Sequence, residues 1–325
     1  MHVRRTAAQI EVLTPAKLNL FLEVLARRPD GYHEIETLMT TVAICDTLTF
    51  IPLEADALEL KCRWVLGLEA RDLVARRLLP SNHDPSNYFG ELPAGPDNLA
   101  WKAVKLIRDQ SGTKRGARLS LVKRIPAAAG LGGASSDAAA ALVAANLGWN
   151  LNWPRERLVE LAAELGSDVP FFLGLPFMEL SFLGQCAALC RGRGEQMEPV
   201  RARRLNVVVV RPPVGLATRE VYRRCRPASA PASAQNLRQA LECGNAARAA
   251  GELTNRLQQP AAELTPWIGR LRTEFARQDC LGHQMSGSGS SYFGICRHAR
   301  HARRVASRLR ARQAGTVYAA ATASA

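Results

Sequence analysis

The segment from Arg118 to Leu147 restricts the fold of this chain most, because it predicts a strand, a glycine-rich loop and a helix in succession. Its first part places leucine and isoleucine on one face up to Ile125, as a half-buried strand requires. Pro126 then ends the strand, since proline has no N–H to donate to a sheet. From Asp137 onward alanine and leucine dominate, which favours a helix.

The ends of that helix are also predicted from residue type. Ser135 or Ser136 is the natural N-cap, because a serine hydroxyl accepts a hydrogen bond from the first turn. Gly148 stands where a left-handed C′ residue ends many helices.

Three glycines, Gly130, Gly132 and Gly133, lie between the strand and the helix. Glycine has no Cβ to keep a ligand from the backbone, and a helix start offers unpaired N–H groups and a positive dipole end. The loop therefore predicts an anion site, with phosphate as the expected anion. It fits neither GxxxxGK[ST] nor GxGxxG, because no lysine follows Gly133 and Ser135 replaces the last glycine. A tight turn in which the glycines serve packing is the alternative.

The string PAAAGLGGASSDAA resembles the ATP-binding signature of the GHMP kinases, small-molecule kinases that include galactokinase, homoserine kinase and mevalonate kinase. That signature has a proline, three small residues, GLGG, a small residue and two serines. Ala134 departs mildly from it, in a place that is often glycine. The resemblance implies that the loop binds ATP through Pro126, Ala127, Ala128, Ala129, Gly130, Leu131, Gly132, Gly133, Ala134, Ser135 and Ser136.

Composition bounds the class of protein. The 325 residues are enough for one large or two medium domains, and no apolar run is long enough for a membrane helix. The N-terminus MHVRRTAAQIEV lacks the apolar stretch of a secretory signal, so we expect a soluble, cytoplasmic protein. The eight cysteines show no CxxC spacing, which favours reduced, mostly buried thiols over disulfides or a metal site.

The formal charge of +14 agrees with nucleic acid, an anionic membrane surface or acidic substrates as partners. Much of the excess lies in residues 297–312, RHARHARRVASRLRAR, where Ala302, Val305, Ala306 and Leu309 recur at helical spacing. This pattern favours a surface helix with a solvated arginine face over a binding surface. Positive charge also attracts polyphosphates over long range, which suits a kinase without proving one.

The segment KLNLFLEVL, which begins at Lys17, alternates in polarity and predicts a strand. Lys17 and Asn19 share the face opposite Leu18, about 7 Å apart along the strand. Such a pair can bind a phosphate or a hydroxyl, although most pairs of this kind are simply the wet face of a sheet. Residues 9–13 predict a separate strand, which the following Thr-Pro dipeptide ends.

The turn Pro-Asp-Gly leads to Tyr32 and His33. An aromatic ring beside an imidazole can stack on a nucleobase and hydrogen-bond its edge, whereas a surface turn with an incidental histidine is the alternative. Residues 34–51 are rich in β-branched side chains and predict one or two strands.

The longer string PAKLNLFLEVLARRPDGYHEIETLM resembles the opening of the GHMP kinases of non-mevalonate isoprenoid precursor biosynthesis. This resemblance implies a transferase that uses ATP and Mg²⁺ to phosphorylate the 2-hydroxyl of 4-CDP-2-C-methyl-D-erythritol. It implies that Tyr32 and His33 hold the cytosine, and that Asn19 and Lys123 bind polar parts of the site.

Two residues are predicted to be catalytic. Asp168, in Gly-Ser-Asp-Val-Pro, is by itself a routine N-cap before a helical proline, but the matching family string carries the active-site aspartate. By that resemblance Asp168 accepts a proton from the acceptor hydroxyl or orients it. Lys17 lowers the pKa of that hydroxyl or stabilises the transferring phosphoryl oxygens.

GHQMSGSGSSYFGICR resembles a third family motif, a glycine-rich loop that lines the active site. It implies ligand contacts from Gly287, Ser288 and Gly289, although serine and glycine alone more often mean a flexible turn. The residues SYFGIC that follow predict an edge strand.

The remaining segments predict connecting elements. A helix is expected from Asp97 or Asn98 to Gly112, another at about 154–165, and a buried strand in RLNVVVVRPP. Residues 226–234 read as a Pro/Ala/Ser linker, followed by helices to about Gln278 that Pro260 and Pro266 interrupt. The stretch at 71–96 is expected to be an insertion of unassigned role.

The resemblance, rather than periodicity, implies the fold class. It is α+β, with an N-terminal domain like ribosomal protein S5 domain 2 over residues 1–175 and a ferredoxin-like C-terminal domain over residues 176–325. The expected partner is the small-molecule substrate, with no nucleic acid and no membrane, in a monomer or homodimer.

Two other functions stay open from the sequence. The glycine loop alone allows a GHMP kinase for a sugar or an amino-acid alcohol, and the RPDGYH string and a test of acceptors discriminate against that alternative. An RNA-binding module is suggested by the positive charge and the S5-like fold, and it would show steeply salt-dependent RNA binding.

Overall fold

The computed structural model describes residues 1–65, 92–174 and 187–323 and divides into two compact units. Unit 1 comprises residues 1–16, 45–127 and 132–184, and unit 2 comprises residues 17–44, 128–131 and 185–325. Each unit therefore contains separate segments of the chain. The predicted boundary near residue 175 lies outside the described residues and stays a prediction.

The strands of unit 1 form one twisted sheet layer. β1 (His2–Arg5) pairs antiparallel with the start of β2 (Ile10–Arg27), and the end of β3 (His33–Leu53) pairs antiparallel with β5 (Gly116–Lys123). β4 (Leu58–Trp64) then pairs parallel with β5.

Two predictions about these strands are corrected or sharpened. The two strands expected on either side of Thr14 and Pro15 are one strand, β2, which runs through the dipeptide. Residues 34–51 form a single long strand within β3. The segment at 71–96 lies largely outside the described residues.

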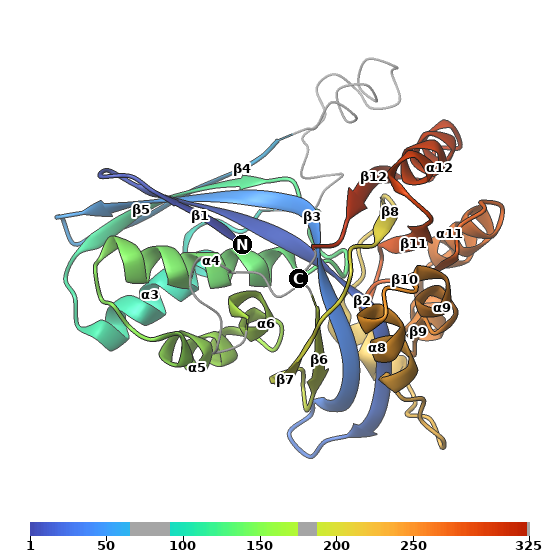
Figure 1. Cartoon of the computed structure of the whole chain (residues 1–325). Coiled ribbons are helices and arrows are strands. Elements are labelled where there is room, and N and C mark those ends of the chain that lie inside the picture. The colour runs from blue at the N-terminus through green and yellow to red at the C-terminus, as the bar shows by residue number, and fades with distance from the viewer. Residues whose placement is uncertain (66–91, 175–186, 324–325) are drawn as a thin grey trace. The chain divides into compact units, whose positions relative to one another are not determined.

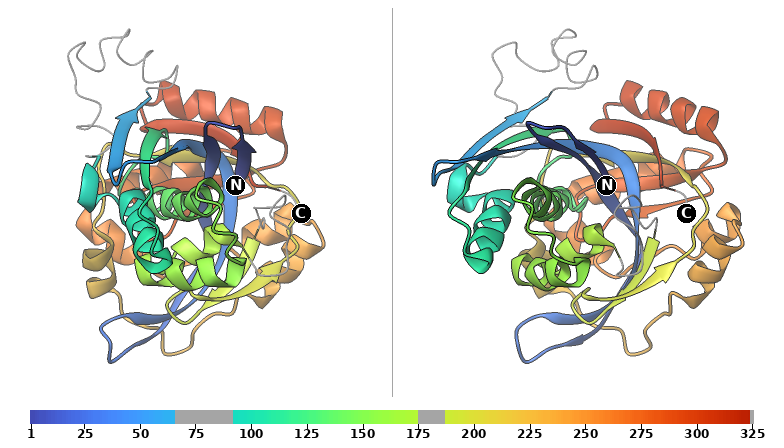
Figure 2. Two further views of the ribbon diagram at one scale, coloured as in Figure 1. Left: turned by 90° about the vertical axis from the view of Figure 1, so that its left-hand side faces the viewer. Right: turned by 60° about the vertical axis from the view of Figure 1, so that its left-hand side comes forward.

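Four helices cover one face of this layer (Figures 1 and 2). They are α3 (Leu99–Ser111), α4 (Gly133–Gly148), α5 (Arg155–Leu165) and α6 (Val169–Leu173), and the short 3₁₀ helix η1 (Gly95–Asp97) precedes them. Asn98 caps α3 by accepting the Ala100 N–H, and Gly112 ends it in the left-handed conformation, as predicted. Gly166 likewise ends α5.

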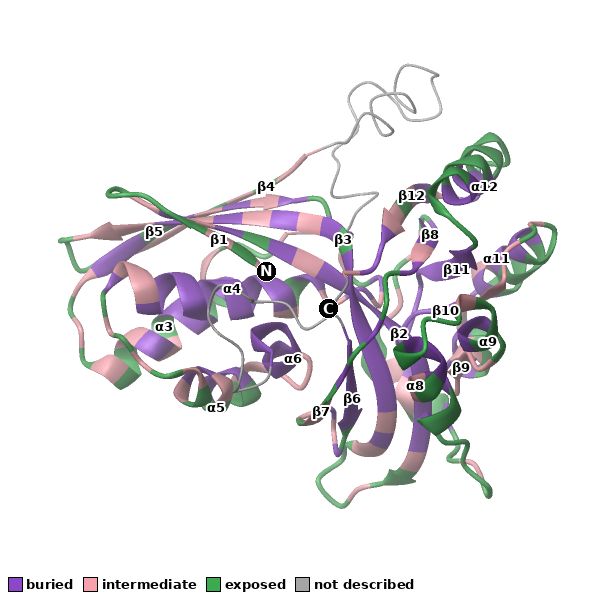
Figure 3. Ribbon diagram, in the orientation of Figure 1, coloured by how far each residue is buried: buried purple, intermediate pink, exposed green. Residues whose placement is uncertain are grey.

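Helix α4 is buried over most of its length (Figure 3), but both of its predicted ends are wrong. It begins at Gly133, with left-handed Gly132 as N-cap, so the two serines lie inside its first turns. Gly148 remains helical, and the left-handed residue that follows is Asn150. Gly148 is needed for packing, because a Cβ there would lie 2.4 Å from Cε1 of Phe50.

The strands of unit 2 fall into two groups. In the first, β3 pairs antiparallel with β6 (Ala187–Arg191), which pairs with β7 (Gln196–Val200), and β2 pairs with β9 (Thr254–Asn255). In the second, an antiparallel sheet has the order β10-β11-β8-β12. Its strands are β10 (Gly282–Met285), β11 (Tyr292–Cys296), β8 (Asn206–Arg211) and β12 (Thr316–Ala321).

The four-stranded sheet confirms the buried strand in RLNVVVVRPP and corrects the predicted edge strand. The four valines of β8 are fully buried. Residues 292–296 form an interior strand, because β11 pairs with β10 on one side and with β8 on the other. Five fully buried residues therefore replace the expected exposed edge.

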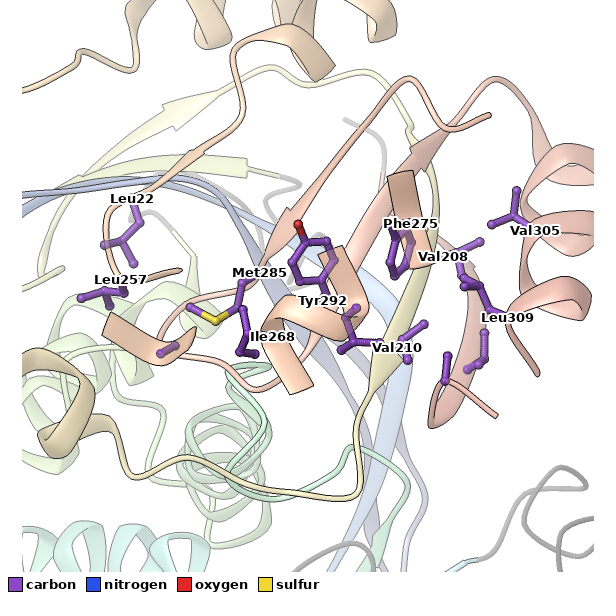
Figure 4. Close-up of a cluster of buried hydrophobic side chains, with 14 of the residues drawn as sticks. Leu22, Val208, Val210, Leu257, Ile268, Phe275, Met285, Tyr292, Val305 and Leu309 are labelled. Carbon is purple, nitrogen blue, oxygen red and sulfur yellow. The ribbon is translucent and has the colours of Figure 1, made fainter. Parts of the chain in front are cut away.

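Helices α11 (Pro266–Ala276) and α12 (Ala299–Ala311) pack on this sheet. Figure 4 shows Phe275 of α11 and Val305 and Leu309 of α12 beside Val208 and Tyr292 of the strands. The predicted apolar stripe of α12 is confirmed, since its four residues are buried and the arginines face outward.

The outward face of α12 carries five arginines: Arg300, Arg303, Arg304, Arg308 and Arg310. Its outward arginines are exposed, and Asp279 forms ion pairs with Arg297 and Arg304 while it accepts from His301. Exposed ion pairs of this kind contribute little stability. The helix is therefore held by its buried stripe of alanine, valine and leucine, and its charge remains available to attract anions over long range.

The other helices of unit 2 are α7 (Thr218–Arg224), α8 (Gln235–Glu242), α9 (Ala246–Gly251) and α10 (Gln258–Leu264). Pro260 lies in the first turn of α10 and Pro266 opens α11, so only the second proline separates two helices. The backbone N–H of a residue in the first turn of a helix has no intrahelical acceptor. Proline, which lacks that N–H, is therefore tolerated at both positions.

The described cysteines are all free thiols, three of them buried. None of the helices in the described part of the chain has both the length and the apolar character needed to span a membrane.

We predict that Gly148→Ala destabilises the protein by about 1–3 kcal/mol, because its methyl group would overlap the buried Phe50 ring. Gly269→Ala is the matched control, since Gly269 is exposed in α11 and a Cβ there would have no neighbouring atom within 4 Å. The control should gain up to about 1 kcal/mol. Urea unfolding of both variants measures the difference, and equal effects would contradict the packing role of Gly148.

Candidate active site

Lys17 and Asn19 on β2 are neighbours, as predicted, but they are buried rather than wet, with exposed fractions of 5% and 3%. The Lys17 ammonium donates to Oδ1 of Asn19 at 2.5 Å. The Asn19 amide in turn donates to the Thr37 hydroxyl at 2.8 Å, and Thr37 donates to the carbonyl of Phe21. This chain of hydrogen bonds fixes the amide orientation of Asn19 and aims its oxygen at the ammonium.

Residues 128–131 of the glycine loop belong to unit 2 and are held there by their carbonyl groups. The carbonyl of Leu131 accepts the Lys17 N–H at 2.9 Å, and that of Gly130 accepts the Ser286 hydroxyl at 3.0 Å. A Cβ on Gly130 would lie only 2.2 Å from the Ser286 carbonyl. The packing role that the sequence left open therefore applies to this glycine.

The segment 286–289 completes the group in unit 2. Gly287 is left-handed, and a Cβ there would lie 3.0 Å from Oδ1 of Asn19 and 3.1 Å from Nζ of Lys17. Asn255 holds the segment by donating to the carbonyl groups of Met285 and Gly287. The structure thus brings together Lys17, Asn19, Gly130 and Gly287, which the sequence places in three distant segments.

Ser288 and Gly289 lie beside this group without contacting its polar atoms in the described bonds. The Ser288 hydroxyl is 2.9 Å from that of Thr218. Gly289 has a positive φ, and a Cβ there would lie 2.8 Å from the sulfur of Met285. Their predicted ligand contacts stay predictions.

Tyr32 and His33 stand together at the start of β3, as the sequence predicted. The Tyr32 ring is 53% exposed, and the Arg193 guanidinium lies 4.9 Å from its centre. The His33 ring is 5.1 Å from the ring of Tyr222. Burial and the nearby Arg27 lower the pKa of His33, which keeps its imidazole neutral at neutral pH. Neither Arg193 nor Tyr222 was found from the sequence.

Asp168 immediately precedes α6, whose five residues are all buried. Asp168 is the N-cap residue of α6 before a helical proline, as the routine interpretation predicted, but its side chain makes no capping hydrogen bond to that helix. Helix α6 packs against α4 and α5 within unit 1, which gives the partly exposed carboxyl group a rigid support.

Lys123 at the end of β5 is buried and bonded to two carboxylates. Its ammonium donates to Asp137 of α4 at 2.5 Å and to Asp46 of β3. Burial alone would lower the pKa of Lys123, but Asp137 and Asp46 outweigh it and raise that pKa. The predicted contact of Lys123 with substrate stays a prediction, because its described bonds are to protein groups. Sequence reasoning did not single out Asp46 or Asp137.

At the start of α4, Ser136 has a fully buried hydroxyl with no hydrogen-bond partner in the structure. A buried hydroxyl without a partner is costly, so one in the first turns of a helix is consistent with a ligand that supplies the missing bond. Gly133, Ala134 and Ser135 precede the first backbone hydrogen bond of this helix, which the Ser136 N–H donates to the Gly132 carbonyl at 2.9 Å, so their N–H groups have no intrahelical partner.

Comparison with known proteins identifies the family. The family described as GHMP kinases N terminal domain matches residues 98–174, and GHMP kinases C terminal matches residues 233–315. The 4-diphosphocytidyl-2-C-methyl-D-erythritol kinase of Pelotomaculum thermopropionicum is 39% identical over 304 residues, which cover 93% of this chain and 94% of that protein. The chain belongs to the GHMP kinase family.

Other relatives agree with this GHMP kinase assignment. The 4-diphosphocytidyl-2-C-methyl-D-erythritol kinase of Bacillus subtilis is 34% identical and covers 91% of each chain. A crystal structure of 4-(cytidine 5'-diphospho)-2C-methyl-D-erythritol kinase is 32% identical, with a TM-score of 0.74, and covers 97% of this chain and all of that one. A homoserine kinase from Cytophaga hutchinsonii shares only the fold, at 16% identity and a TM-score of 0.67.

The family membership confirms the predicted α+β GHMP fold. As a GHMP kinase, the protein is a transferase that uses ATP as phosphate donor for a small-molecule acceptor.

We predict that Gly287→Ala lowers kinase turnover about tenfold or more, because the methyl group would crowd Lys17 and Asn19 and strain a left-handed residue. Gly251→Ala, at the end of α9 with open space around it, is the control and should leave turnover unchanged. Steady-state kinetics measures both, and a fully active Gly287→Ala enzyme would contradict this view of the site.

Proposed function

We propose that this kinase transfers the γ-phosphoryl group of ATP to the 2-hydroxyl of 4-CDP-2-C-methyl-D-erythritol, giving the 2-phosphate and ADP. Relatives that span more than nine-tenths of the chain are named for that substrate. The structural observation that carries the proposal is the buried pair of Lys17 and Asn19 against the backbone of Gly130 and Gly287. It holds a cation in a fixed position, and a fixed cation can stabilise the negative charge on the oxygens of a transferring phosphoryl group.

On the donor side, the start of α4 is proposed to bind the phosphates of ATP. Its free N–H groups and dipole favour an anion, and residues 126–136 supply the loop and the first turns. The unpaired hydroxyl of Ser136 supports a ligand at this position.

The residues fit Mg²⁺ as an additional charge sink. Mg²⁺ prefers oxygen ligands, commonly one or two from the protein and others from substrate phosphates. The Ser136 hydroxyl and the Asp168 carboxylate are the oxygen donors that we propose from unit 1. The described residues contain no group of three or more His, Cys, Asp or Glu side chains that could hold a metal unaided. When bound, Mg²⁺ would supply charge neutralisation on the transferring phosphoryl group.

On the acceptor side, Lys17 and Asp168 are proposed to share the chemistry. Asp168 would accept the proton of the 2-hydroxyl or orient that hydroxyl toward the phosphorus. Lys17, held by Asn19, would stabilise the negative charge that develops on the oxygens. Because Asn19 is itself fixed by Thr37, the ammonium needs little reorganisation during the reaction.

The cytosine is proposed to bind at Tyr32 and His33. The exposed face of Tyr32 offers a stacking surface, while a neutral imidazole offers one donor and one acceptor for a base edge. Asn19 and residues 287–289 would bind polar parts of the acceptor. A cytoplasmic location and a monomeric or homodimeric state remain predictions.

We expect the purified enzyme to release ADP from ATP with 4-CDP-2-C-methyl-D-erythritol and not with homoserine, galactose or mevalonate. The reason is that only the first acceptor carries a base that Tyr32 and His33 could bind. A coupled assay for ADP release measures this. Preference for any of the other three acceptors would overturn the assignment.

We predict that Lys17→Ala and Asp168→Asn each lower turnover about a hundredfold or more, the usual effect of removing charge-stabilising or acid–base groups. Lys105→Ala and Asp109→Asn are the matched controls. These residues form an exposed ion pair on α3, and their loss should leave turnover unchanged. Circular dichroism checks that all four variants fold. Wild-type turnover in the two active-site variants would refute the assigned roles.

A further inference from the structure

Four buried polar side chains from four different elements of unit 1 meet beside the start of α4. Thr14 comes from β2, Asp46 from β3, Lys123 from β5 and Asp137 from α4, and none is more than 5% exposed. We call these four residues the buried charge cluster. Lys123 donates to both carboxylates, and the Thr14 hydroxyl donates to Asp137 at 2.9 Å.

The buried charge cluster is electrostatically unusual, because two carboxylates share one ammonium away from water. Burial and the second carboxylate raise the pKa of Asp137, although Lys123 opposes the change. Burying ion pairs costs much of what their attraction returns, so such a group contributes little net stability over an apolar packing. Net stability therefore does not explain why these charges are buried here.

The bonds of the cluster reach both ends of the glycine loop. On the entry side, one oxygen of Asp46 accepts the backbone N–H groups of Arg124 and Ile125, directly before Pro126. On the exit side, the Lys123 ammonium donates to the carboxylate of Asp137, one turn into α4.

Gly133, the first residue of α4, packs closely against Lys123 of the cluster and against the neighbouring Ile125. A Cβ on Gly133 would lie 2.9 Å from Cγ2 of Ile125 and 3.3 Å from Nζ of Lys123. The ammonium therefore lies against the backbone of the first helical residue.

We propose that Lys123, together with Asp46 and Asp137, is a positioning group for the phosphate site: it fixes the entry of the glycine loop and the first turn of α4. In this proposal Lys123 acts through these protein groups, in place of the direct substrate contact that the family resemblance implied. The inference rests on the proposed binding of ATP at the start of α4. The residues of the cluster control ATP affinity by holding the backbone of the phosphate site.

Variants that remove charges from the buried charge cluster test the proposal most directly. Lys123→Met leaves two buried carboxylates without a cation beside a site that must accept a polyanion. The triple variant Lys123→Met/Asp46→Asn/Asp137→Asn removes the charges together and keeps oxygen acceptors for the N–H groups of Arg124 and Ile125. If Lys123 acts through the carboxylates, the triple variant should bind ATP better than the single variant. If Lys123 binds phosphate directly, the triple variant should be at least as impaired.

The experiment measures the Kd of a non-hydrolysable ATP analogue by calorimetry without acceptor, and then KM for both substrates and kcat. We expect Lys123→Met to weaken analogue binding about tenfold or more, as loss of supporting groups around a ligand site commonly does. The acceptor KM should stay within about threefold of wild type, and the triple variant should recover most of the lost affinity. No recovery, or a larger effect on the acceptor KM, would overturn the proposal.

Asp137→Asn keeps the test decisive if Lys123→Met does not fold. Its amide can still accept the Thr14 hydroxyl, but it removes one of the two charges that hold Lys123. We expect analogue binding about threefold or more weaker, whereas unchanged affinity would refute the positioning role. A wild-type enzyme that binds the analogue but rejects the cytidylyl acceptor would refute the proposed function and leave this test intact.

Discussion

The backbone of the glycine loop packs at distances that no larger residue permits, and both units depend on that packing. In unit 2 a Cβ on Gly130 would overlap the carbonyl of Ser286, and in unit 1 a Cβ on Gly133 would overlap Ile125. The hydrogen bonds that the carbonyl groups of residues 129–131 accept from Lys17, Ser286 and Ser291 depend on this close approach. Because Gly130 and Gly133 lack side chains, the backbone can approach closely enough to form the contacts that hold these polar groups in place.

Around that loop, most of the described buried polar side chains have a hydrogen-bond partner. In unit 2, Asn19 bonds to both Lys17 and Thr37, and Asn255 bonds to two carbonyl groups of the neighbouring loop. Buried polar networks that are fully satisfied specify one geometry, because breaking any bond leaves an expensive unpaired group. Among the described residues beside the loop, the buried hydroxyls of Ser136 and Ser291 are exceptions, and Ser136 lies where ATP is proposed to bind.

The sequence determined the local elements whose signals are contained within a few residues. The capped helix α3, the end of α5 at Gly166, the apolar stripe of α12 and the strand–loop–helix order around the glycines all followed from residue type and spacing. The family resemblance supplied the fold and the kinase activity, which the comparisons confirm. These features are readable because caps, periodicity and motifs act between near neighbours.

The tertiary structure alone decided what depends on residues far apart in the chain. It made Gly148 a packing residue against Phe50, turned SYFGIC into an interior strand and carried β2 through Thr14 and Pro15. It also brought Lys17, Asn19, Gly130 and Gly287 together and joined Lys123 to Asp46 and Asp137. No local pattern encodes these contacts, because each depends on residues that are distant in the sequence. Those residues set the energy of burying a polar or charged group, and they lie beside it only in the folded chain.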